Sequence, residues 1–271
     1  MIEMSDKEIS FFDSNKQLWN KKTSVHKSSE LYDLEGFKAG RNVLNSIELD
    51  ALGDVNGKTI LHLQCHFGLD TMSWARLGAK VAGVDFSDNA VNTAREINEQ
   101  VGLDAEFICS NVYDLKEHLD RKFDIVFTSY GVIGWLPDLD RWADIVDHFL
   151  APGGTFYMAE FHPVLWMLDD NFEQLHYSYF NQGVIEIDVE GTYADREAEI
   201  SHKEYSWNHS LSEVVTALRN RGLNLEQLQE FNYSPYNCFP NTVESEAGGY
   251  YIKGLEKVLP MVYSVLATKD A

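Results

Sequence analysis

The residues best suited to chemistry in this sequence are a glycine-bearing turn and an acid that follows it. The turn, Gln64-Cys65-His66-Phe67-Gly68, separates the apolar run Thr59–Leu63 from a stretch of helical character. Asp85 ends the next apolar run, 19 residues after His66. A strand, a turn and a helix followed by an acid at this distance are typical of sites that grip the hydroxyls of a ribose. The two features together predict a nucleoside-containing cofactor, whereas Asp85 alone fits a helix-capping or turn carboxylate equally well.

The residue types in the turn select among nucleoside cofactors. Dinucleotide sites use G-x-G-x-x-G so that the backbone can approach a pyrophosphate, but Gln64 and His66 stand at two of the glycine places. Asp70 follows at the start of the helix, where a negative charge opposes a phosphate group. The turn therefore favours a cofactor without phosphate and with a positive centre. His62, His66 and Asp70 recur every four residues, but the strand-then-loop pattern argues against a metal face, and no metal is predicted.

Short apolar runs alternate with helical segments through the middle of the chain. One helical segment has Ala90, Val91, Ala94 and Ile97 at helical spacing, and Ser87 is placed to cap it. The runs predicted as strands are Thr59–Leu63, Lys80–Val84, Ala105–Cys109, Phe123–Thr128 and Thr155–Ala159. Parallel neighbours need crossover connections, so this alternation predicts an α/β fold with a parallel sheet.

The residues before and after this alternating region show a different pattern of apolar, aromatic and charged residues. Residues 1–50 mix charges with scattered aromatic side chains and are predicted to form helices that pack over the sheet, with Trp19 and His26 closing over the cofactor as a lid. After Pro163, alternation between apolar and acidic residues from Ile185 to Glu190 predicts a half-exposed strand in an inserted antiparallel cap, residues 164–208. Residues 51–271, including that cap, are predicted to form the main domain.

Composition excludes several classes of partner. The 271 residues carry 43 acidic and 22 basic side chains, a formal charge of −21. Affinity for nucleic acid or anionic lipid rests on lysine and arginine, so neither is expected as a partner. The three cysteines are widely spaced, there is no secretory signal pattern, and no apolar stretch reaches the length of a membrane span. We expect a cytoplasmic protein, a monomer or homodimer.

Five segments in the same order resemble the class I S-adenosylmethionine-dependent methyltransferases. The resemblance covers Lys58 to about Pro163, with weaker agreement through the C-terminal strands. The most specific match is Leu150-Ala151-Pro152-Gly153-Gly154, which is similar to the family's L-x-P-G-G turn before the fifth strand. The other similar segments are Leu61–Gly68, Gly83-Val84-Asp85-Phe86-Ser87, Asn111-Val112-Tyr113-Asp114-Leu115 and Phe123-Asp124-Ile125-Val126. In the first of these, only Gly68 keeps a family glycine, and His62 stands where the family has an acid.

The resemblance implies a Rossmann-like, seven-stranded, mostly parallel sheet flanked by helices, with S-adenosylmethionine as cofactor and S-adenosylhomocysteine as product. By the same resemblance Asp85 would hold the ribose and Phe86 would form a wall against the adenine. The residues expected to contact the cofactor are Gln64, Cys65, His66, Gly68, Asp85, Phe86, Ser87, Asn111, Val112, Ser129, Tyr130 and Gly131.

The resemblance also implies methyl transfer to a small-molecule acceptor, which the acidic insertion and the aromatic residues outside the sheet suggest is neutral, aromatic or cationic. Glu160, His162 and Tyr130 are the candidate catalytic residues, although His162 before Pro163 could equally stabilise a turn. Two alternatives remain open: a non-catalytic protein that binds S-adenosylmethionine, and a nicotinamide-dependent oxidoreductase. No tyrosine lies four residues before a lysine, which argues against the short-chain type of the latter.

Overall fold

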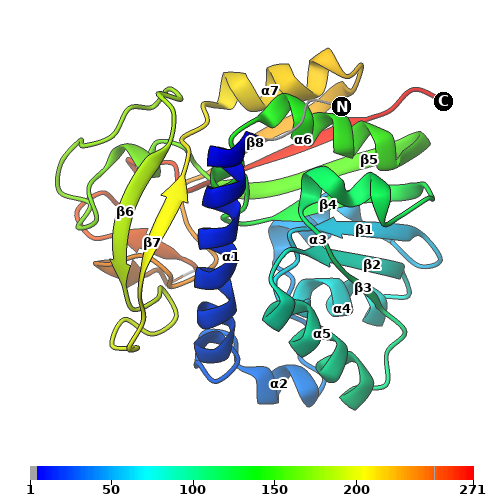
Figure 1. Cartoon of the computed structure of the whole chain (residues 1–271), viewed down its shortest axis with the longest axis horizontal. Coiled ribbons are helices and arrows are strands. Elements are labelled where there is room, and N and C mark those ends of the chain that lie inside the picture. The colour runs from blue at the N-terminus through cyan, green and yellow to red at the C-terminus, as the bar shows by residue number, and fades with distance from the viewer. Residues whose placement is uncertain (1–4, 247) are drawn as a thin grey trace.

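A seven-stranded sheet forms the centre of the computed structural model, which describes residues 5–246 and 248–271 (Figure 1). Its strand order is β3-β2-β1-β4-β5-β11-β8. The strands are β1 (Thr59–Leu63), β2 (Lys80–Asp85), β3 (Glu106–Cys109), β4 (Phe123–Ser129), β5 (Leu150–Phe161), β8 (Asn224–Phe231) and β11 (Val262–Thr268). Strands β1 to β5 pair in parallel, and β11 runs antiparallel to both β5 and β8. The expected α/β fold with a mostly parallel, seven-stranded sheet is confirmed.

Helices cover both faces of this sheet. They are α1 (Asp6–His26), α2 (Leu34–Lys38), α3 (Ser46–Leu52), α4 (Leu69–Arg76), α5 (Asp88–Gln100), α6 (Leu139–Phe149) and α7 (Leu211–Asn220), with short 3₁₀ turns η1 (Val112–Glu117), η2 (Ile133–Trp135) and η3 (Leu165–Met167). The residues expected on the inner face of α5 are all buried, and Ser87 caps this helix by accepting a hydrogen bond from the backbone of Ala90. Helical periodicity in the sequence thus located the packed faces.

The fifth strand starts earlier than the expected Thr155. Strand β5 begins at Leu150, directly after α6, and includes the Pro152-Gly153-Gly154 turn. The pairing with β4 shifts between Phe123 and Ile125 at this level, and Gly153 adopts a φ of +72°. At a bulged strand end the regular ladder of hydrogen bonds is interrupted, so a proline and a glycine with positive φ can be accommodated there. The turn motif that was expected to precede the strand therefore lies within it.

Two small antiparallel sheets lie outside the central sheet. The expected insertion after β5 contains β6 (Ile185–Glu190) and β7 (Ser201–Ser206), and β6 alternates between half-buried and exposed positions as predicted. Strands β9 (Thr242–Glu244) and β10 (Tyr250–Ile252) form a second pair between β8 and β11, which the sequence pattern had not indicated. In the described ranges 5–246 and 248–271, no helix has both the length and the apolar composition needed to cross a membrane.

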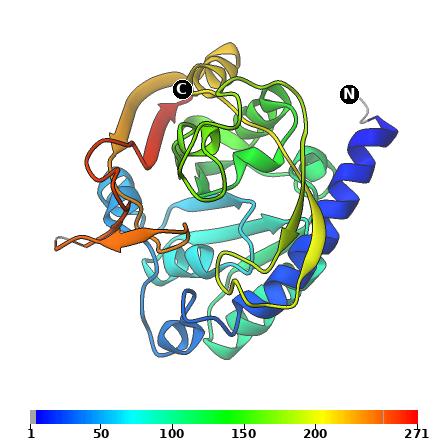
Figure 2. The same cartoon turned by 90° about the vertical axis from the view of Figure 1, so that its left-hand side faces the viewer.

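Helix α1 stands between the β6–β7 ribbon and the central sheet (Figure 1), and in the turned view it runs alongside β7 (Figure 2). The side-chain amide of Asn15 donates to the carbonyl of Tyr205 at 2.7 Å and accepts from its backbone N–H at 3.0 Å. Lys22 is buried and forms an ion pair with Glu204 at 3.2 Å. These contacts join the N-terminal helix and the insertion into one layer.

Candidate functional site

Strand order reverses at β1, which lies between β2 and β4. In open α/β sheets, ligands bind beyond the carboxyl ends of the strands at such a switch point. The chain that leaves β1 there is the turn Gln64–Gly68. This places the turn, the end of β2 and the end of β4 around one position, which is the candidate site.

The turn after β1 has a left-handed backbone at alternate residues. The φ angles are +56° at Gln64, +51° at His66 and +77° at Gly68. Only glycine adopts this region without strain, and other residues pay of order 1–3 kcal/mol each. The chain therefore follows the course expected for a glycine-rich turn even though a glutamine and a histidine occupy two of its positions. Strain retained in this way is characteristic of functional turns.

The glycines of this region keep the turn close to the neighbouring strands. A Cβ atom on Gly68 would lie 2.4 Å from the Phe107 ring, and one on Gly83 would lie 2.8 Å from Sγ of Cys65. Both contacts are shorter than real Cβ atoms show. Close approach of the turn to β2 and β3 thus depends on these two glycines.

Asp85, at the end of β2, is tied to the turn. Its Oδ2 accepts a hydrogen bond from the backbone of His66 at 2.8 Å, and its Oδ1 accepts one from the backbone of Ser87 at 2.9 Å. Burial raises the pKa of Asp85 to about 6. At neutral pH the group is a carboxylate held by two amides, and it lies where the sequence predicted a ribose contact.

The ends of β2 and β3 lie side by side. The backbone of Ser110 donates to the carbonyl of Asp85 at 3.0 Å, and the backbone carbonyl of Phe86 accepts from the thiol of Cys109. Asn111 caps η1 through the backbone N–H of Tyr113 at 3.1 Å, and Val112 is buried. The residues assigned to adenine by resemblance therefore follow the ends of adjacent strands, and their roles remain predictions.

A chain of polar side chains connects β1, α4 and the end of β4. His62 is buried, with Nδ1 at 2.8 Å from Oγ1 of Thr71 and Nε2 at 3.1 Å from Oγ of Ser129. Ser129 in turn donates to Oδ2 of Asp70 at 2.9 Å. Burial lowers the pKa of His62 to about 3 and raises that of Asp70 to about 6. His62 is thus neutral and serves as a relay of hydrogen bonds.

A second acid reaches the end of β4 from helix α3. The Tyr130 hydroxyl donates to Oε2 of Glu48 at 2.9 Å, while Oε1 accepts from the backbone of Asn45 at 2.7 Å. The side chain of Asn45 also donates to the Tyr236 hydroxyl at 2.8 Å. Burial, with a further contribution from Asp70, raises the pKa of Glu48 to about 7.

Glu160 is committed to backbone contacts. Its Oε1 accepts from the amides of Gly131 and Phe161, and its Oε2 accepts from those of Val132 at 2.7 Å and Ile133 at 3.1 Å. Four amides thus occupy both oxygens of a buried carboxylate. Glu160 holds the loop after β4 in place, and this geometry leaves it no free oxygen for a proton.

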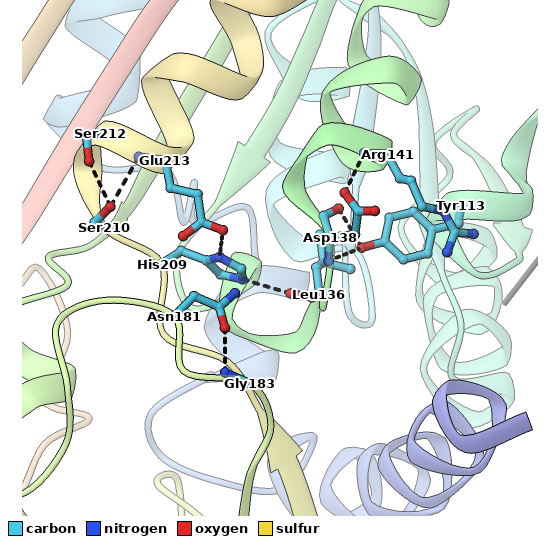
Figure 3. A network of polar contacts seen from close by, with 10 residues as sticks. All are labelled: Tyr113, Leu136, Asp138, Arg141, Asn181, Gly183, His209, Ser210, Ser212 and Glu213. Atoms are coloured by element: carbon cyan, nitrogen blue, oxygen red, sulfur yellow. Dashed lines mark hydrogen bonds and ion pairs between the residues drawn. The ribbon is translucent and has the colours of Figure 1, made fainter. Parts of the chain in front are cut away.

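His162 and His209 also have structural contacts. Nε2 of His162 lies 2.9 Å from Oε1 of Glu230, and its Nδ1 accepts from the backbone of Val164 at 3.2 Å, so the ring closes the turn around Pro163. His209 contacts the start of α7: its Nδ1 lies 2.8 Å from Oε1 of Glu213, and its Nε2 donates to the carbonyl of Leu136 at 2.7 Å (Figure 3).

Helix α1 covers the turn with aromatic side chains. The Trp19 ring meets those of His66 and Trp135 edge-on, with centroids 5.2 and 5.3 Å apart. Nδ1 of His26 lies 2.9 Å from Nε2 of His66. The side-chain oxygen of Asn20, the residue after Trp19, accepts from the Ser87 hydroxyl at 2.6 Å. The N-terminal helix therefore lies directly on the turn after β1 and on the start of α5.

Three buried polar atoms around the turn make no hydrogen bond within residues 5–246 and 248–271: Oε1 of Gln64, Nδ1 of His66 and Nε2 of His26. An unpaired buried polar atom costs about 1–3 kcal/mol. Such atoms, grouped at a strained turn, fit a ligand that carries its own donors and acceptors, such as an amino acid attached to a nucleoside.

A hollow of about 450 Å³ opens beside this layer, between the two insertions. It is lined by Tyr193, Ala194, Asp195 and Arg196 from the β6–β7 connection and by Asn237, Phe239, Asn241 and Thr242 from the segment before β9. The Tyr193 hydroxyl lies 2.6 Å from that of Tyr32, and the Tyr32 ring stacks on His26. The rings of Tyr32 and His26 therefore connect Tyr193, in one wall of the hollow, to the turn after β1.

Sequence reasoning did not single out Glu48, and it considered Asp70 as an acid at a helix start and as part of a rejected metal face, but not as a ligand-binding residue. The signal for Glu48 was its spacing of three residues from Asn45, which is that of a capping box. Its proximity to Tyr130 depends on tertiary packing over 82 residues of sequence, which no local pattern encodes.

Comparison with known proteins agrees with the fold. Residues 60–154 match a family model described as a methyltransferase domain. A ubiquinone biosynthesis O-methyltransferase of Xanthomonas oryzae pv. oryzae is 28% identical over 131 residues, which are 47% of this chain and 54% of the relative. The chain thus spans about half the length of the curated relatives it matches.

Two solved structures share the architecture at low sequence identity. A putative S-adenosylmethionine-dependent methyltransferase from Listeria monocytogenes has a TM-score of 0.57 at 18% identity, covering 83% of this chain and 98% of the other. An S-adenosylmethionine-dependent methyltransferase from Mesorhizobium loti has a TM-score of 0.56 at 22% identity, covering 86% and 100%. These likenesses establish the fold.

Proposed function

We propose that this chain, a class I S-adenosylmethionine-dependent methyltransferase, transfers a methyl group to a small-molecule acceptor. The observation that carries the proposal is the left-handed backbone at Gln64, His66 and Gly68, with Asp85 bonded to the middle of the turn. The sequence departs from a glycine-rich motif, but the backbone retains the course such a motif would take. The unpaired Gln64 and His66 atoms at this turn fit the polar amino-acid part of the cofactor.

The contacts proposed for the cofactor follow the strand ends. Asp85 holds the ribose hydroxyls, and Phe86, Asn111 and Val112 border the adenine. Gln64, Cys65, His66, Gly68 and Ser87 surround the methionine and ribose from the turn and from the start of α5, while Ser129, Tyr130 and Gly131 lie near the methyl group. Helix α1 closes this space, which supports the proposed division into an N-terminal lid, residues 1–50, and a main domain with an inserted cap.

Bound S-adenosylmethionine supplies an electrophilic methyl group on a sulfonium. The protein contributes alignment of the acceptor with this group, and orientation of two reactants can supply roughly 7–11 kcal/mol. Closure by α1 also excludes water from the site, which strengthens electrostatic interactions within it. Alignment is thus the main contribution we assign to the fold.

For an acceptor hydroxyl or ammonium, the proton passes to Tyr130 and Glu48. Tyr130 Oη accepts the proton from the acceptor as its own proton moves to Oε2 of Glu48, which lies 2.9 Å away. The pKa of Glu48, about 7, is matched to such a role at neutral pH. We propose this pair in place of Glu160 and His162, because hydrogen bonds to backbone amides and to Glu230 engage the polar atoms of those two side chains.

The acceptor we propose is neutral, aromatic or cationic. The insertion from Asp169 to Glu204 has ten acids and two bases, which disfavours anions near the opening. Tyr193 lines the hollow and packs against His26, and the Tyr236 ring packs against Tyr130, so aromatic rings near the hollow and the site suit an apolar or aromatic molecule. We place the protein in the cytoplasm, in keeping with its three free cysteines.

Calorimetric titration tests the proposed function. S-adenosylhomocysteine is expected to bind with a 1:1 stoichiometry, and a nicotinamide dinucleotide is expected not to bind. Binding of the dinucleotide alone would favour an oxidoreductase, and binding of neither would overturn the proposal. Transfer of a labelled methyl group to a panel of phenols and amines then separates an enzyme from a protein that only binds the cofactor.

A further inference from the structure

We propose that Asp70 binds the α-ammonium group of the cofactor's amino-acid part, and that the hydrogen-bonded chain through Ser129 and His62 positions it for this. The inference rests on the proposed function and names the residue that holds the cationic end. It accounts for His62, which stands where the resembling family has an acid. The negative charge missing from β1 is present eight residues later, on the first turn of α4.

The hydrogen bonds of the chain all point toward Asp70. Ser129 donates its hydroxyl proton to Oδ2 of Asp70, so its oxygen must accept from Nε2 of His62. His62 therefore carries its proton on Nε2, and its Nδ1 accepts from the Thr71 hydroxyl. The order of donation is Thr71, His62, Ser129, Asp70. Each side chain in this order donates a hydrogen bond to the next one, and the last hydrogen bond ends on Oδ2 of Asp70.

The second oxygen of Asp70 is left for a ligand. Within the described ranges, Oδ1 of Asp70 makes no hydrogen bond and has no basic partner, and the side chain is only half-buried. The carboxylate is thus fixed in orientation by Ser129 and open on its other side. A carboxylate oxygen presented in this way recognises a cationic donor, and an amino-acid ammonium is such a group.

Among residues 5–246 and 248–271, no positively charged side chain is paired with Asp70. The charge of Asp70 contributes to the raised pKa of four neighbouring groups, which are the phenols of Tyr32 and Tyr236, the thiol of Cys65 and the carboxyl of Glu48. Asp70 and Glu48 therefore lie in one region in which the described part of the chain pairs neither acid with a cation. Burial of an uncompensated carboxylate is costly, and a ligand cation removes that cost.

Independent observations place the amino-acid end of the ligand here. The unpaired Oε1 of Gln64 and Nδ1 of His66 flank the same turn, on the residues that precede α4. Asp85, proposed for the ribose, bonds to the backbone of His66. A nucleoside bound at Asp85 would therefore extend its 5′ substituent along the turn toward Asp70, whereas an acid at this helix start disfavours a phosphate group.

Two ligands that differ only in the amino-acid part test the inference. S-adenosylhomocysteine carries the ammonium, and 5′-methylthioadenosine lacks the whole amino-acid portion. Titration calorimetry of Asp70→Asn is expected to show about ten- to a hundredfold weaker binding of S-adenosylhomocysteine, from loss of a charged hydrogen bond, with 5′-methylthioadenosine unchanged. The matched control is Asp140→Asn, because Asp140 is likewise the second residue of its helix, after a leucine, but is exposed.

Ser129→Ala provides a second variant that keeps the charge. It frees the pinned oxygen of Asp70, so S-adenosylhomocysteine is expected to bind several-fold more weakly, with a smaller effect on 5′-methylthioadenosine, which lacks the ammonium. Circular dichroism confirms that each variant is folded before titration. In the wild type, the desamino analogue of S-adenosylhomocysteine is expected to lose the same ten- to a hundredfold, independently of any substitution.

The outcomes separate this inference from the proposed function. If the wild type binds neither S-adenosylhomocysteine nor 5′-methylthioadenosine, the proposed function fails. If it binds both and Asp70→Asn leaves the two affinities unchanged, or weakens them equally, the assignment of Asp70 fails while the proposed function stands. Full affinity of the desamino analogue for the wild type would also overturn the assignment.

Discussion

Nδ1 of His26 lies 2.9 Å from Nε2 of His66, so that a hydrogen bond between the buried imidazole of His26 and the half-buried imidazole of His66 joins helix α1 to the turn after β1. Burial and the nearby Lys22 lower the pKa of His26 to about 3, and burial holds the pKa of His66 well below its usual range. Both rings are therefore neutral at physiological pH, one as donor and one as acceptor. The contact ties the N-terminal helix to the residues proposed to hold the cofactor.

His26→Phe is expected to destabilise the protein by about 1–3 kcal/mol at pH 7.5, because it leaves His66 without its partner. The variant should also lose less stability between pH 7 and 5.5. A histidine whose folded pKa is lowered binds protons preferentially in the unfolded state, so its stabilising effect falls as pH drops below about 6.5. Urea unfolding at the two pH values measures both effects. His118→Phe, on an exposed side chain, is the control, and identical pH dependence of His26→Phe and wild type would contradict the prediction.

The left-handed backbone at Gln64 makes a second prediction. Gln64→Gly is expected to be more stable than Gln64→Ala by about 1 kcal/mol, because both lose the hydrogen bond to the carbonyl of Val132 but only alanine retains the strain. The opposite order is expected at the exposed helical residue Glu96, where alanine is favoured by roughly the same amount. The free energies of unfolding of the glycine and alanine variants at positions 64 and 96 test this prediction. An alanine variant at position 64 as stable as the glycine variant would mean that the turn is not strained.

Glu160→Gln tests the positioning role given to this carboxylate. A side-chain amide cannot accept hydrogen bonds from all four backbone amides, since its nitrogen would face two of them as a donor. We expect a loss of about 2–4 kcal/mol in the free energy of unfolding. His162→Gln, which retains a donor for Glu230, should cost less. Thermal unfolding of both variants in the absence of ligand measures this, and a Glu160→Gln variant as stable as wild type would show that the four contacts contribute little.

Much of the fold could be predicted because its signals are local. The buried face of α5 is spaced at helical intervals, the apolar runs of β1 to β5 are separated by helices, and Ser87 precedes the helix it caps. Each of these depends on residues close together in the sequence. The β9–β10 pair was not indicated, since its strands have three residues each and show no extended alternation.

The sequence predicted where the candidate site lies but not which contacts its side chains make. The turn and Asp85 could be located because strand ends in a parallel sheet meet at one edge. The partners of Glu160, and the contact of Glu48 with Tyr130, depend on how separate elements pack. In the sequence, a glutamate near the end of a strand looks the same whether it faces backbone amides or a substrate. Neighbouring charges and burial, which set the chemistry of these acids, exist only in the folded chain.

The raised pKa of Glu48 predicts an unusual pH dependence of stability. In the unfolded chain this group has a pKa near 4.5, and in the folded protein burial raises the pKa to about 7. A carboxyl with a raised folded pKa stabilises fully below the unfolded value and loses this contribution as pH rises through the folded one. Between pH 4.5 and 8 the loss amounts to about 3 kcal/mol, because a tenfold change in proton affinity corresponds to about 1.4 kcal/mol.

Glu48→Gln removes this titration but keeps an acceptor for Asn45 and a donor for the Tyr130 oxygen. Relative to wild type, the variant is therefore expected to gain about 2–3 kcal/mol between pH 5 and pH 8, measured by urea unfolding at both values. Glu35→Gln serves as the control, because Glu35 is an exposed acid on α2. If the curves of wild type and Glu48→Gln run parallel with pH, Glu48 titrates normally, and the proton-accepting role proposed for the Tyr130–Glu48 pair loses its physical basis.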